Sequence, residues 1–438
     1  MRFHAAALAL LLVLPTMAED AEDGPNATTL GHIQRTEVLR GLKFEKNPSV
    51  RFWDEAELKK MMTADFDEEL PEAKAKQMQD VLFAFGLTPK GYDLRKEFLE
   101  LMVEQVAGFY HPKKKILCLI KGKAGKGLEE ETVIIHELNH AMQDQHFDLT
   151  RLQDLTAKND DMAQAFKCLV EGEATMVMFD HSFLQTQGTT CDQIPGIEGI
   201  IDGLMGSAGG MAGAQKLDAA PPIIKESLVG SYIDGFKFCV GLKRKGGWDG
   251  VNAAWADLPV STEQILHPER YLERDMPQTV KLPAKIDGLD GWEKVEENVM
   301  GEFSVRMVFL TLKPKSKESG EKAAEGWDGD AFRLYAKDGK HLLAWTTVWD
   351  TEVDAREFTS AYVKAIRKKL PGLDEVKADG NGLSHDTERG WVEIKREGKK
   401  VFLAEGGAEA DAKAAVAGML EHATFEEMKP GVGAKEKK

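Results

Sequence analysis

The sequence lacks an excess of basic residues. Its 438 residues include 57 Lys and Arg against 73 Asp and Glu, which gives a formal net charge of −16 at pH 7. A protein that binds a nucleic-acid backbone needs a basic face, because displaced counterions drive the binding. The charge balance therefore excludes nucleic acid as an expected partner.

Long apolar segments are also scarce. The chain begins MRFHAAALALLLVLPTMAED, in which Arg2 precedes an apolar run from Ala5 to Leu14 and the small-residue stretch Thr16–Ala18. The run is too short to span a bilayer, and these three parts are typical of a secretory signal peptide. We expect a signal peptide at 1–18, cleaved near Ala18, and an exported protein (periplasmic or secreted) with no integral membrane span. A buried N-terminal helix is the alternative.

Cysteine is rare, and the four cysteines lack CxxC spacing: Cys118, Cys168, Cys191 and Cys239. Export permits disulfides, but four cysteines allow three pairings, between which a sequence does not choose. Cys239 lies in an apolar helical run and is expected in the core. No disulfide is predicted.

The length and composition indicate a globular protein of two domains, with 42% hydrophobic and 30% charged residues. The predicted parts are a signal peptide (1–18), a flexible N-terminal segment (19–50), a first domain (51–285), a C-terminal α+β domain (286–428) and a disordered tail (429–438). Whether 19–50 is a pro-segment stays open, and no oligomeric state is indicated.

The hydrophobic periodicity predicts an α+β fold that is mainly helical in its first domain. Apolar residues recur every three to four positions in the expected helices, whereas Ile116–Ile120 and the residues before it read as two short strands, a small edge sheet. The Gly-rich stretch 196–213 is expected to be an apolar loop and a candidate lid. The expected helices of the first domain are 54–86, 92–105, 130–145, 163–184 and 221–243.

In the second domain, strands and helices alternate. The stretches 351–355 and 408–412 each follow a predicted hairpin and open a helix with acidic residues. We interpret this likeness as a weak ββα repeat, which would form one four-stranded antiparallel sheet backed by helices. Chance similarity of two acidic helix starts is the alternative.

The strongest motif is HExxH, formed by His136, Glu137 and His140. Spacing of four stacks both imidazoles on one face of a helix, where they can share one Zn²⁺ ion. Glu137 would then act as general base and acid for a water that attacks a carbonyl. An ordinary surface helix is the alternative, but the apolar flanks favour a buried one.

Two residues compete as third ligand. His146 has the spacing of the metzincin motif, but Gln143 stands where the helix-breaking Gly belongs, so a continuing helix would carry His146 about 120° away from His140. The run from Leu169 to Ala174 resembles the second motif of the gluzincin metallopeptidases. This resemblance implies that Glu171 is the third ligand. Thr175 stands where thermolysin-type enzymes have an Asp that orients a ligand His, so in this chain the imidazole must be oriented by another partner.

The resemblance extends to four segments between residues 95 and 275: 108–112, 136–147, 170–174 and 261–271. Together they are similar to a group of exported bacterial metallopeptidases known mainly from their sequences. The resemblance implies a zincin-type metallopeptidase domain acting on a peptide or protein substrate, without implying which one.

Further site residues follow from the roles that such chemistry requires. A donor must face the developing oxyanion, and the candidates are His267, Tyr271 and Tyr232, of which we select His267 and Tyr271. Ile116–Ile120 is placed to be the edge strand that holds an extended peptide, and an ordinary core strand is the alternative that fits its composition equally well. Three other residues have open roles: Glu173 near the site, and Gln143 and Asp144 behind the imidazoles.

The sequence thus predicts an exported zinc metallopeptidase, a hydrolase with metal ligands His136, His140 and Glu171. The catalytic residues are Glu137, His267 and Tyr271, and the cofactor is Zn²⁺. The alternative is a catalytically degenerate zincin that serves as a binding or scaffold protein in the envelope.

Overall fold

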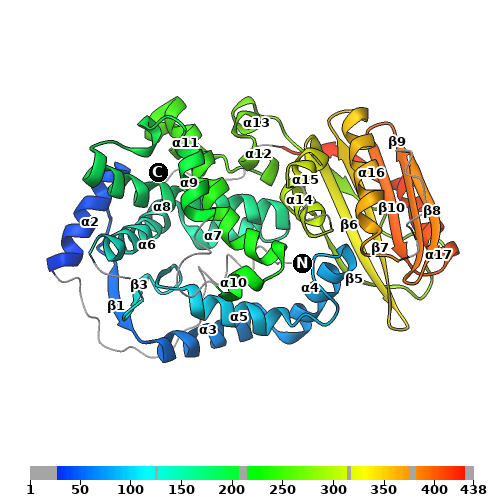
Figure 1. The fold of residues 1–438 in the computed structure, drawn as a ribbon, viewed down its shortest axis with the longest axis horizontal. Coiled ribbons are helices and arrows are strands. Elements are labelled where there is room, and N and C mark those ends of the chain that lie inside the picture. The colour runs from blue at the N-terminus through cyan, green and yellow to red at the C-terminus, as the bar shows by residue number, and fades with distance from the viewer. Residues whose placement is uncertain are drawn as a thin grey trace.

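The computed structural model describes residues 27–123, 127–206, 215–312, 317–371, 373 and 381–429. The molecule is elongated, with a helical half that holds the motif helix at one end and a sheet half at the other (Figure 1). Three predicted segments lie outside the described residues: the signal peptide, residues 430–438 of the tail, and residues 207–213 of the Gly-rich stretch.

The helical half contains the helices α2–α13. Their apolar faces bury against each other, and the two longest, α8 and α11, cross at its centre. The helices are α2 (Ala27–Arg40), α3 (Glu55–Glu69), α4 (Glu72–Phe85), α5 (Leu94–Gln105), α6 (Leu128–Phe147), α7 (Leu149–Thr156), α8 (Asp160–Gln187), α9 (Ile197–Gly206), α10 (Gln215–Ala219), α11 (Pro222–Ala256), α12 (Thr262–Leu266) and α13 (Pro268–Glu273), with a 3-10 turn at Cys191–Gln193.

A three-stranded sheet lies beside α6 in the order β1-β3-β2, formed by β1 (Ser49–Trp53), β2 (Gly108–His111) and β3 (Ile116–Ile120). β3 is apolar throughout and fully buried, because it pairs parallel with β1 and antiparallel with β2. The prediction that Ile116–Ile120 is an edge strand is therefore wrong: both of its edges are occupied, and β2 is the strand next to α6.

The sheet half carries a six-stranded antiparallel sheet in the order β5-β6-β7-β10-β9-β8, not the predicted four strands. The four central strands are the predicted ones, and β5 and β8 extend the sheet at its edges. Its elements are β5 (Glu293–Asn298), α14 (Gly301–Leu312), α15 (Lys317–Ala324), β6 (Trp327–Lys337), β7 (Lys340–Trp349), α16 (Glu352–Ile366), β8 (Gly382–Thr387), β9 (Gly390–Glu397), β10 (Lys400–Gly406) and α17 (Glu409–His422); β4 (Gln278–Lys281) and β11 (Thr424–Glu427) form a separate pair.

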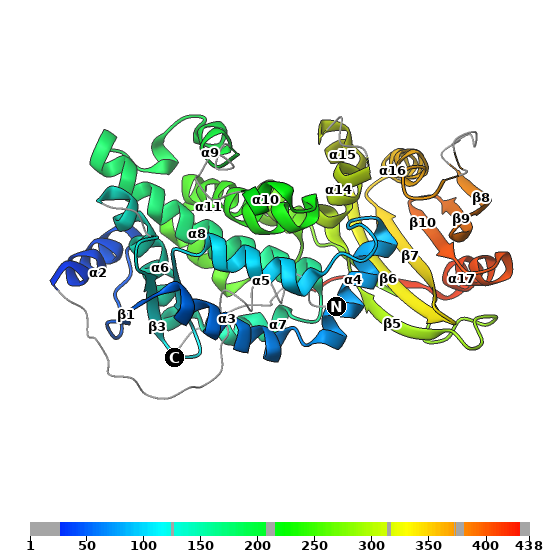
Figure 2. The same ribbon diagram turned by 60° about the horizontal axis from the view of Figure 1, so that its bottom comes forward.

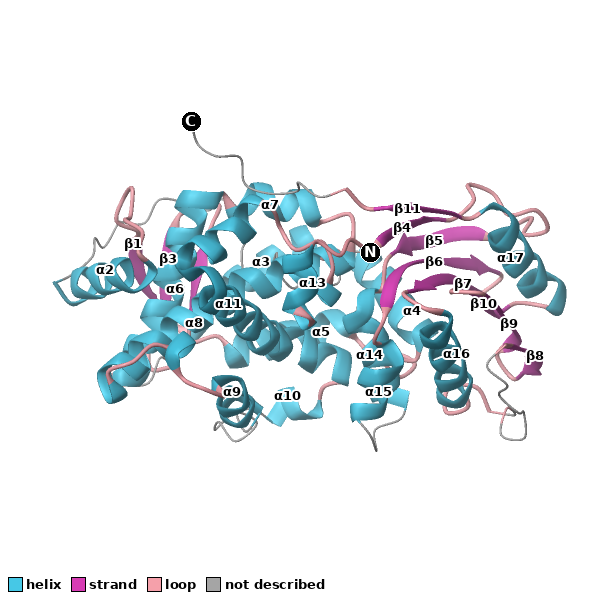
Figure 3. Ribbon diagram, turned by 90° about the horizontal axis from the view of Figure 1, so that it is seen from above, coloured by secondary structure: helices cyan, strands magenta, loops and turns pink. Residues whose placement is uncertain are grey.

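The two helices of the proposed repeat begin alike but pack on opposite faces of the sheet. Asp354 and Asp411 each accept a hydrogen bond from the main-chain N–H that precedes the helix, at 3.0 and 2.8 Å, which explains the similar acidic starts. Along β7, Trp345 packs towards α16 and Ala344 towards α17, since successive side chains alternate. Figure 3 shows the helices on either side of the sheet. The similarity of the two segments therefore lies in how their helices are capped and not in how they pack on the sheet.

The halves share one hydrophobic core. Phe85 at the end of α4 packs edge-on against Phe332 and Trp345 of the sheet, with ring centroids 5.1 Å apart in both pairs. Helices α3, α4 and α5 run along one side of the molecule and reach the sheet through α4 (Figure 2). The domain limits 51–285 and 286–428 stay a prediction.

Two segments expected to be irregular are helical. Residues 27–40 of the predicted flexible segment form α2, which packs against α6 and α8, so that prediction is wrong for these residues. Residues 197–206 of the predicted loop form α9. Within the described ranges, every helix is too short or too polar to be a candidate membrane span.

One buried acid in α3 should make stability depend on pH. Burial raises the pKa of Asp65 to about 8, and both carboxylate oxygens lack a hydrogen-bond partner among the described residues. Because the folded pKa exceeds the unfolded one, the protein should lose stability as pH rises from about 4 to 8. Asp65→Asn should therefore raise the free energy of unfolding at pH 8 by a few kcal/mol, since one pKa unit is about 1.4 kcal/mol.

Thermal unfolding at pH 5 and pH 8 tests this expectation. The gain should shrink at pH 5, where Asp65 is already protonated. Asp67→Asn on the same helix, at a residue that is exposed and paired with Arg95, should change little at either pH. An Asp65→Asn protein with the pH dependence of the wild type would contradict the assignment.

Candidate metal centre

The HExxH motif lies in the buried middle of α6. Three acidic residues in the first turn suit the helix N-terminus, and residues 134–144 are buried. The spacing of four residues places the rings of His136 and His140 edge to face, with centroids 4.7 Å apart. Their Nε2 atoms are 3.1 Å apart, so both point to one spot beside the helix.

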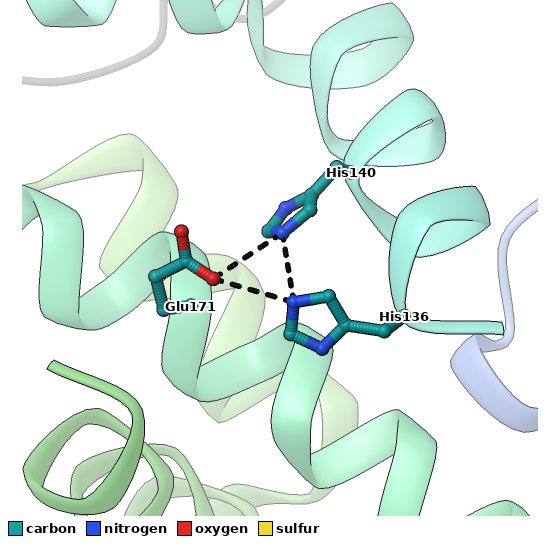
Figure 4. Close-up of side chains that lie close together, drawn as sticks. All are labelled: His136, His140 and Glu171. Atoms are coloured by element: carbon teal, nitrogen blue, oxygen red, sulfur yellow. Dashed lines mark hydrogen bonds and ion pairs between the residues drawn. The ribbon is translucent and has the colours of Figure 1, made fainter. Parts of the chain in front are cut away.

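Glu171 reaches the same spot from α8, as Figure 4 shows. Its Oε2 lies 3.3 Å from His136 Nε2 and 3.4 Å from His140 Nε2, and all three residues are buried. Ligand atoms held about 2.0–2.1 Å from a tetrahedral ion are about 3.3 Å apart. The three distances between the ligand atoms match this expected separation, so these side chains form a group that could hold a metal ion.

The glycine beside Glu171 lets the helices meet. A Cβ on Gly172 would overlap the main-chain carbonyl of Gly235 on α11, and a Cβ on Gly235 would overlap the carbonyl of Cys168. Only glycine allows α8 and α11 to cross this closely. The crossing brings Tyr232 of α11 onto the site, so Gly172 in the second motif is a packing residue.

The charges of the group are mutually dependent. Burial lowers the pKa of His140, but the Glu171 and Glu137 carboxylates outweigh burial and raise it to about 9. Burial raises the pKa of Glu171, and His140 and His136 outweigh it and bring it well below its usual range. A metal ion would replace a proton as the charge that compensates Glu171.

Glu137 lies beside the ligand group. Its Oε2 accepts a hydrogen bond from Tyr110 N of β2 at 2.8 Å, which fixes the carboxylate. Burial raises its pKa, and the two imidazoles only partly oppose this. A carboxylate with a raised pKa is suited to take up and return a proton.

The His140 ring is oriented by Gln143, the residue that stands in place of the metzincin glycine. His140 Nδ1 lies 2.9 Å from Gln143 Oε1, and Gln143 Nε2 donates to Val170 O at 3.0 Å. An amide oxygen accepts and does not donate, so Nδ1 carries the proton and Nε2 keeps its lone pair for a metal. Asp144, the other candidate for this role, instead accepts from Tyr110 Oη at 2.8 Å and from Lys115 Nζ at 2.6 Å.

His136 is held differently. The Tyr232 ring stacks on it with centroids 5.7 Å apart and planes at 19°. Burial, together with the neighbouring Glu171 and Glu137 carboxylates, raises the pKa of Tyr232 well above its usual value. His136 Nδ1 and Thr175 Oγ1 are both buried without a hydrogen-bond partner within the described part of the chain. Within the described residues, His136 is therefore held by aromatic packing and by no hydrogen bond to its Nδ1.

The remaining candidate residues are hydrogen-bonded to residues outside the ligand group. His146 Nε2 bonds to Lys43 O at 2.8 Å, because α6 continues past Gln143. His267 Nε2 lies 3.1 Å from Glu302, and the Tyr271 hydroxyl donates to Asp257 O at 2.8 Å. Among the described residues, neither His267 nor Tyr271 is hydrogen-bonded to the ligand group. Tyr232, in contrast, stacks on His136, and the selection among the three donors stays a prediction.

Two residues near the site were not singled out from the sequence. Arg40 of α2 is buried against Glu173. Lys167 lies one turn before Glu171; its Nζ donates to Ser227 O at 3.0 Å, and burial lowers its pKa to about 8. Neither belongs to a motif, and their long-range partners leave no periodic signal.

Comparisons with known proteins cover other parts of the molecule or are distant. Residues 289–416 match the model of a domain of unknown function, DUF8575, which lies in the sheet half and does not include the ligand group. The search of curated proteins finds no match. A solved structure from Chloroflexus aurantiacus, provisionally described as a hydrolase with a novel fold, is 16% identical, with 63% of this chain and 98% of that chain covered and a TM-score of 0.37. A likeness this weak defines neither the fold nor the activity.

Proposed function

We propose that this chain is an exported, zinc-dependent metallopeptidase that hydrolyses peptide bonds in peptide or protein substrates. The observation that carries the proposal is Glu137, a buried carboxylate fixed beside a His136–His140–Glu171 group whose spacing suits a tetrahedral ion. A purely structural metal site has no use for a second, non-ligating carboxylate beside its three ligands. The exported location rests on the sequence of residues 1–18.

The donor set suits Zn²⁺, which favours imidazole nitrogen and carboxylate oxygen and accepts three protein ligands with a fourth position for water. Bound there, the ion would supply a water of lowered pKa and a Lewis acid. Glu137 takes the proton of the attacking water and returns it to the leaving amine. The hydroxyl of Tyr232, whose ring stacks on His136, is a candidate donor to the developing oxyanion.

An extended substrate would pair with β2. Within the described residues β2 pairs only with β3, and Tyr110 N, bonded to Glu137, points to its other side. A peptide added along this edge would bring its scissile carbonyl close to Glu137, with main-chain hydrogen bonds that ignore side-chain identity. This geometry favours broad specificity for unfolded segments.

Replacing the third ligand tests the site. Glu171→Ala should lose most of its bound zinc and its cleavage of an unfolded protein, whereas His146→Ala, on the same helix as the two histidines, should keep both. Zinc per chain after dialysis and the appearance of new N-termini are the measurements. Full zinc affinity in Glu171→Ala would overturn the ligand set. A wild-type protein that binds zinc and cleaves no unfolded protein would favour a scaffold.

A further inference from the structure

A buried ion pair joins the N-terminal helix to the centre of the helical half. Arg40, the last residue of α2, donates from Nε to Glu173 Oε1 at 2.8 Å and from Nη2 to Oε2 at 3.2 Å. The side chains are 1% and 0% exposed. The guanidinium also lies 4.3 Å from the centroid of the Trp248 ring and donates to Asn252 at 2.7 Å. Because the pair is bidentate and fully enclosed, its two side chains are held in one geometry.

Glu173 passes this geometry on towards the ligand group. Besides Arg40 it accepts from Trp255 Nε1 at 2.7 Å, Asn139 Nδ2 at 3.1 Å and Gln143 Nε2 at 3.3 Å. Gln143 in turn holds His140 Nδ1. Arg40, Glu173, Gln143 and His140 therefore form one continuous line of hydrogen bonds through the protein interior.

The residues after α2 are tied to the motif helix as well. His146 bonds to Lys43 O, and Gln145 accepts from Glu45 N at 2.8 Å and donates to Lys46 O at 2.7 Å. β1 then pairs with β3 along its whole length. The stretch 27–53 thus contacts α6 at both its middle and its end.

We infer that Arg40 and Glu173 are positioning residues of the metal centre. Arg40 fixes the Glu173 carboxylate, Glu173 fixes the Gln143 amide, and the amide oxygen keeps the His140 proton on Nδ1. The inference rests on metal binding by the ligand group but on no catalytic step. Loss of such outer partners lowers metal affinity by about 10- to 100-fold in metalloproteins.

A double-mutant cycle on the full-length chain tests the line. Arg40→Met and Gln143→Met should each weaken zinc binding about 10- to 100-fold and perturb the visible spectrum of the Co²⁺-loaded protein. Among the described residues, the hydrogen bonds that link Arg40 to Gln143 pass through Glu173. The double variant should therefore be no worse than Gln143→Met alone. Arg40→Lys keeps the charge but loses a donor, so it should give a smaller loss, and it serves if Arg40→Met does not fold.

Lys243→Met is the matched control. Lys243 is a partly buried cation of α11 that pairs with Asp180 of α8 at 2.6 Å and lies over the same Trp248 ring, 4.6 Å from its centroid. Among the described residues, no hydrogen bond joins Lys243 or Asp180 to His140. Loss of Lys243 should lower the unfolding temperature and leave zinc affinity unchanged. Folded Arg40 variants with wild-type zinc affinity, or equal loss in Lys243→Met, would overturn the inference. A wild-type chain that binds no zinc would instead refute the proposed function.

Discussion

Glu137→Gln is expected to lower peptide hydrolysis by about 10³-fold or more while the protein keeps its zinc. The amide retains the size of the carboxylate but cannot accept the proton of the attacking water, and general base catalysis contributes roughly 10²–10⁴-fold. The three metal ligands are unchanged by this substitution, because Glu137 is not one of them and its carboxylate is hydrogen-bonded to Tyr110 N. Cleavage rate and zinc per chain must be measured on the same preparation.

Glu130→Gln is the control for this substitution. Glu130 lies on the same helix but is exposed in its first turn, so its loss should leave both cleavage and zinc unchanged. A Glu137→Gln protein that cleaves at the wild-type rate would refute the catalytic role. Loss of zinc together with activity would mean that Glu137 supports the metal.

Gly172→Ala should prevent the helical half from packing, although alanine is the better helix former. The added Cβ would overlap the main chain of Gly235, which cannot rotate away as a side chain could. Overpacking costs about 1–3 kcal/mol where side chains can yield, and we expect more here because α8 and α11 must separate. Tyr232 would then leave His136, so zinc affinity should fall along with the unfolding temperature and the soluble yield.

Gly199→Ala in α9 separates this effect from helix propensity. A Cβ at Gly199 has no neighbour within 4 Å, so the variant should be as stable as the wild type or slightly more stable. Circular dichroism and thermal unfolding of both variants make the comparison. A Gly172→Ala protein with wild-type unfolding temperature would show that the two helices can shift apart at little cost.

The ligand group could be predicted largely because its information is local. His136 and His140 are one helical turn apart, and a helix of 3.6 residues per turn brings them together whatever surrounds it. Gln143 correctly argued against His146, since without a glycine α6 continues and carries His146 to Lys43. The prediction of Glu171 as third ligand depended on a resemblance. Its position 3.3 Å from His136 follows from the packing of α8 against α6, which the sequence does not give.

The neighbours of the group could not be predicted, because they come from elements far apart in the chain. Tyr232, His267 and Tyr271 are equally plausible donors by residue type, and only the close approach of α8 and α11 at Gly172 shows that Tyr232 stacks on His136. β3 looked like an edge because β1, its second partner, lies more than sixty residues earlier. Strand pairing depends on which segments meet, and apolar composition does not report it.

By itself the sequence determined the motif helix, its two imidazoles and Glu137, which lies between them in the sequence, since these follow from helical geometry over a few residues. Only the tertiary structure decided what surrounds them: Tyr232 against His136, Tyr110 on Glu137, and Arg40 behind Gln143 through Glu173. The physical reason is that a buried polar group requires a partner but does not specify where in the chain it comes from. That choice is made when helices and strands pack.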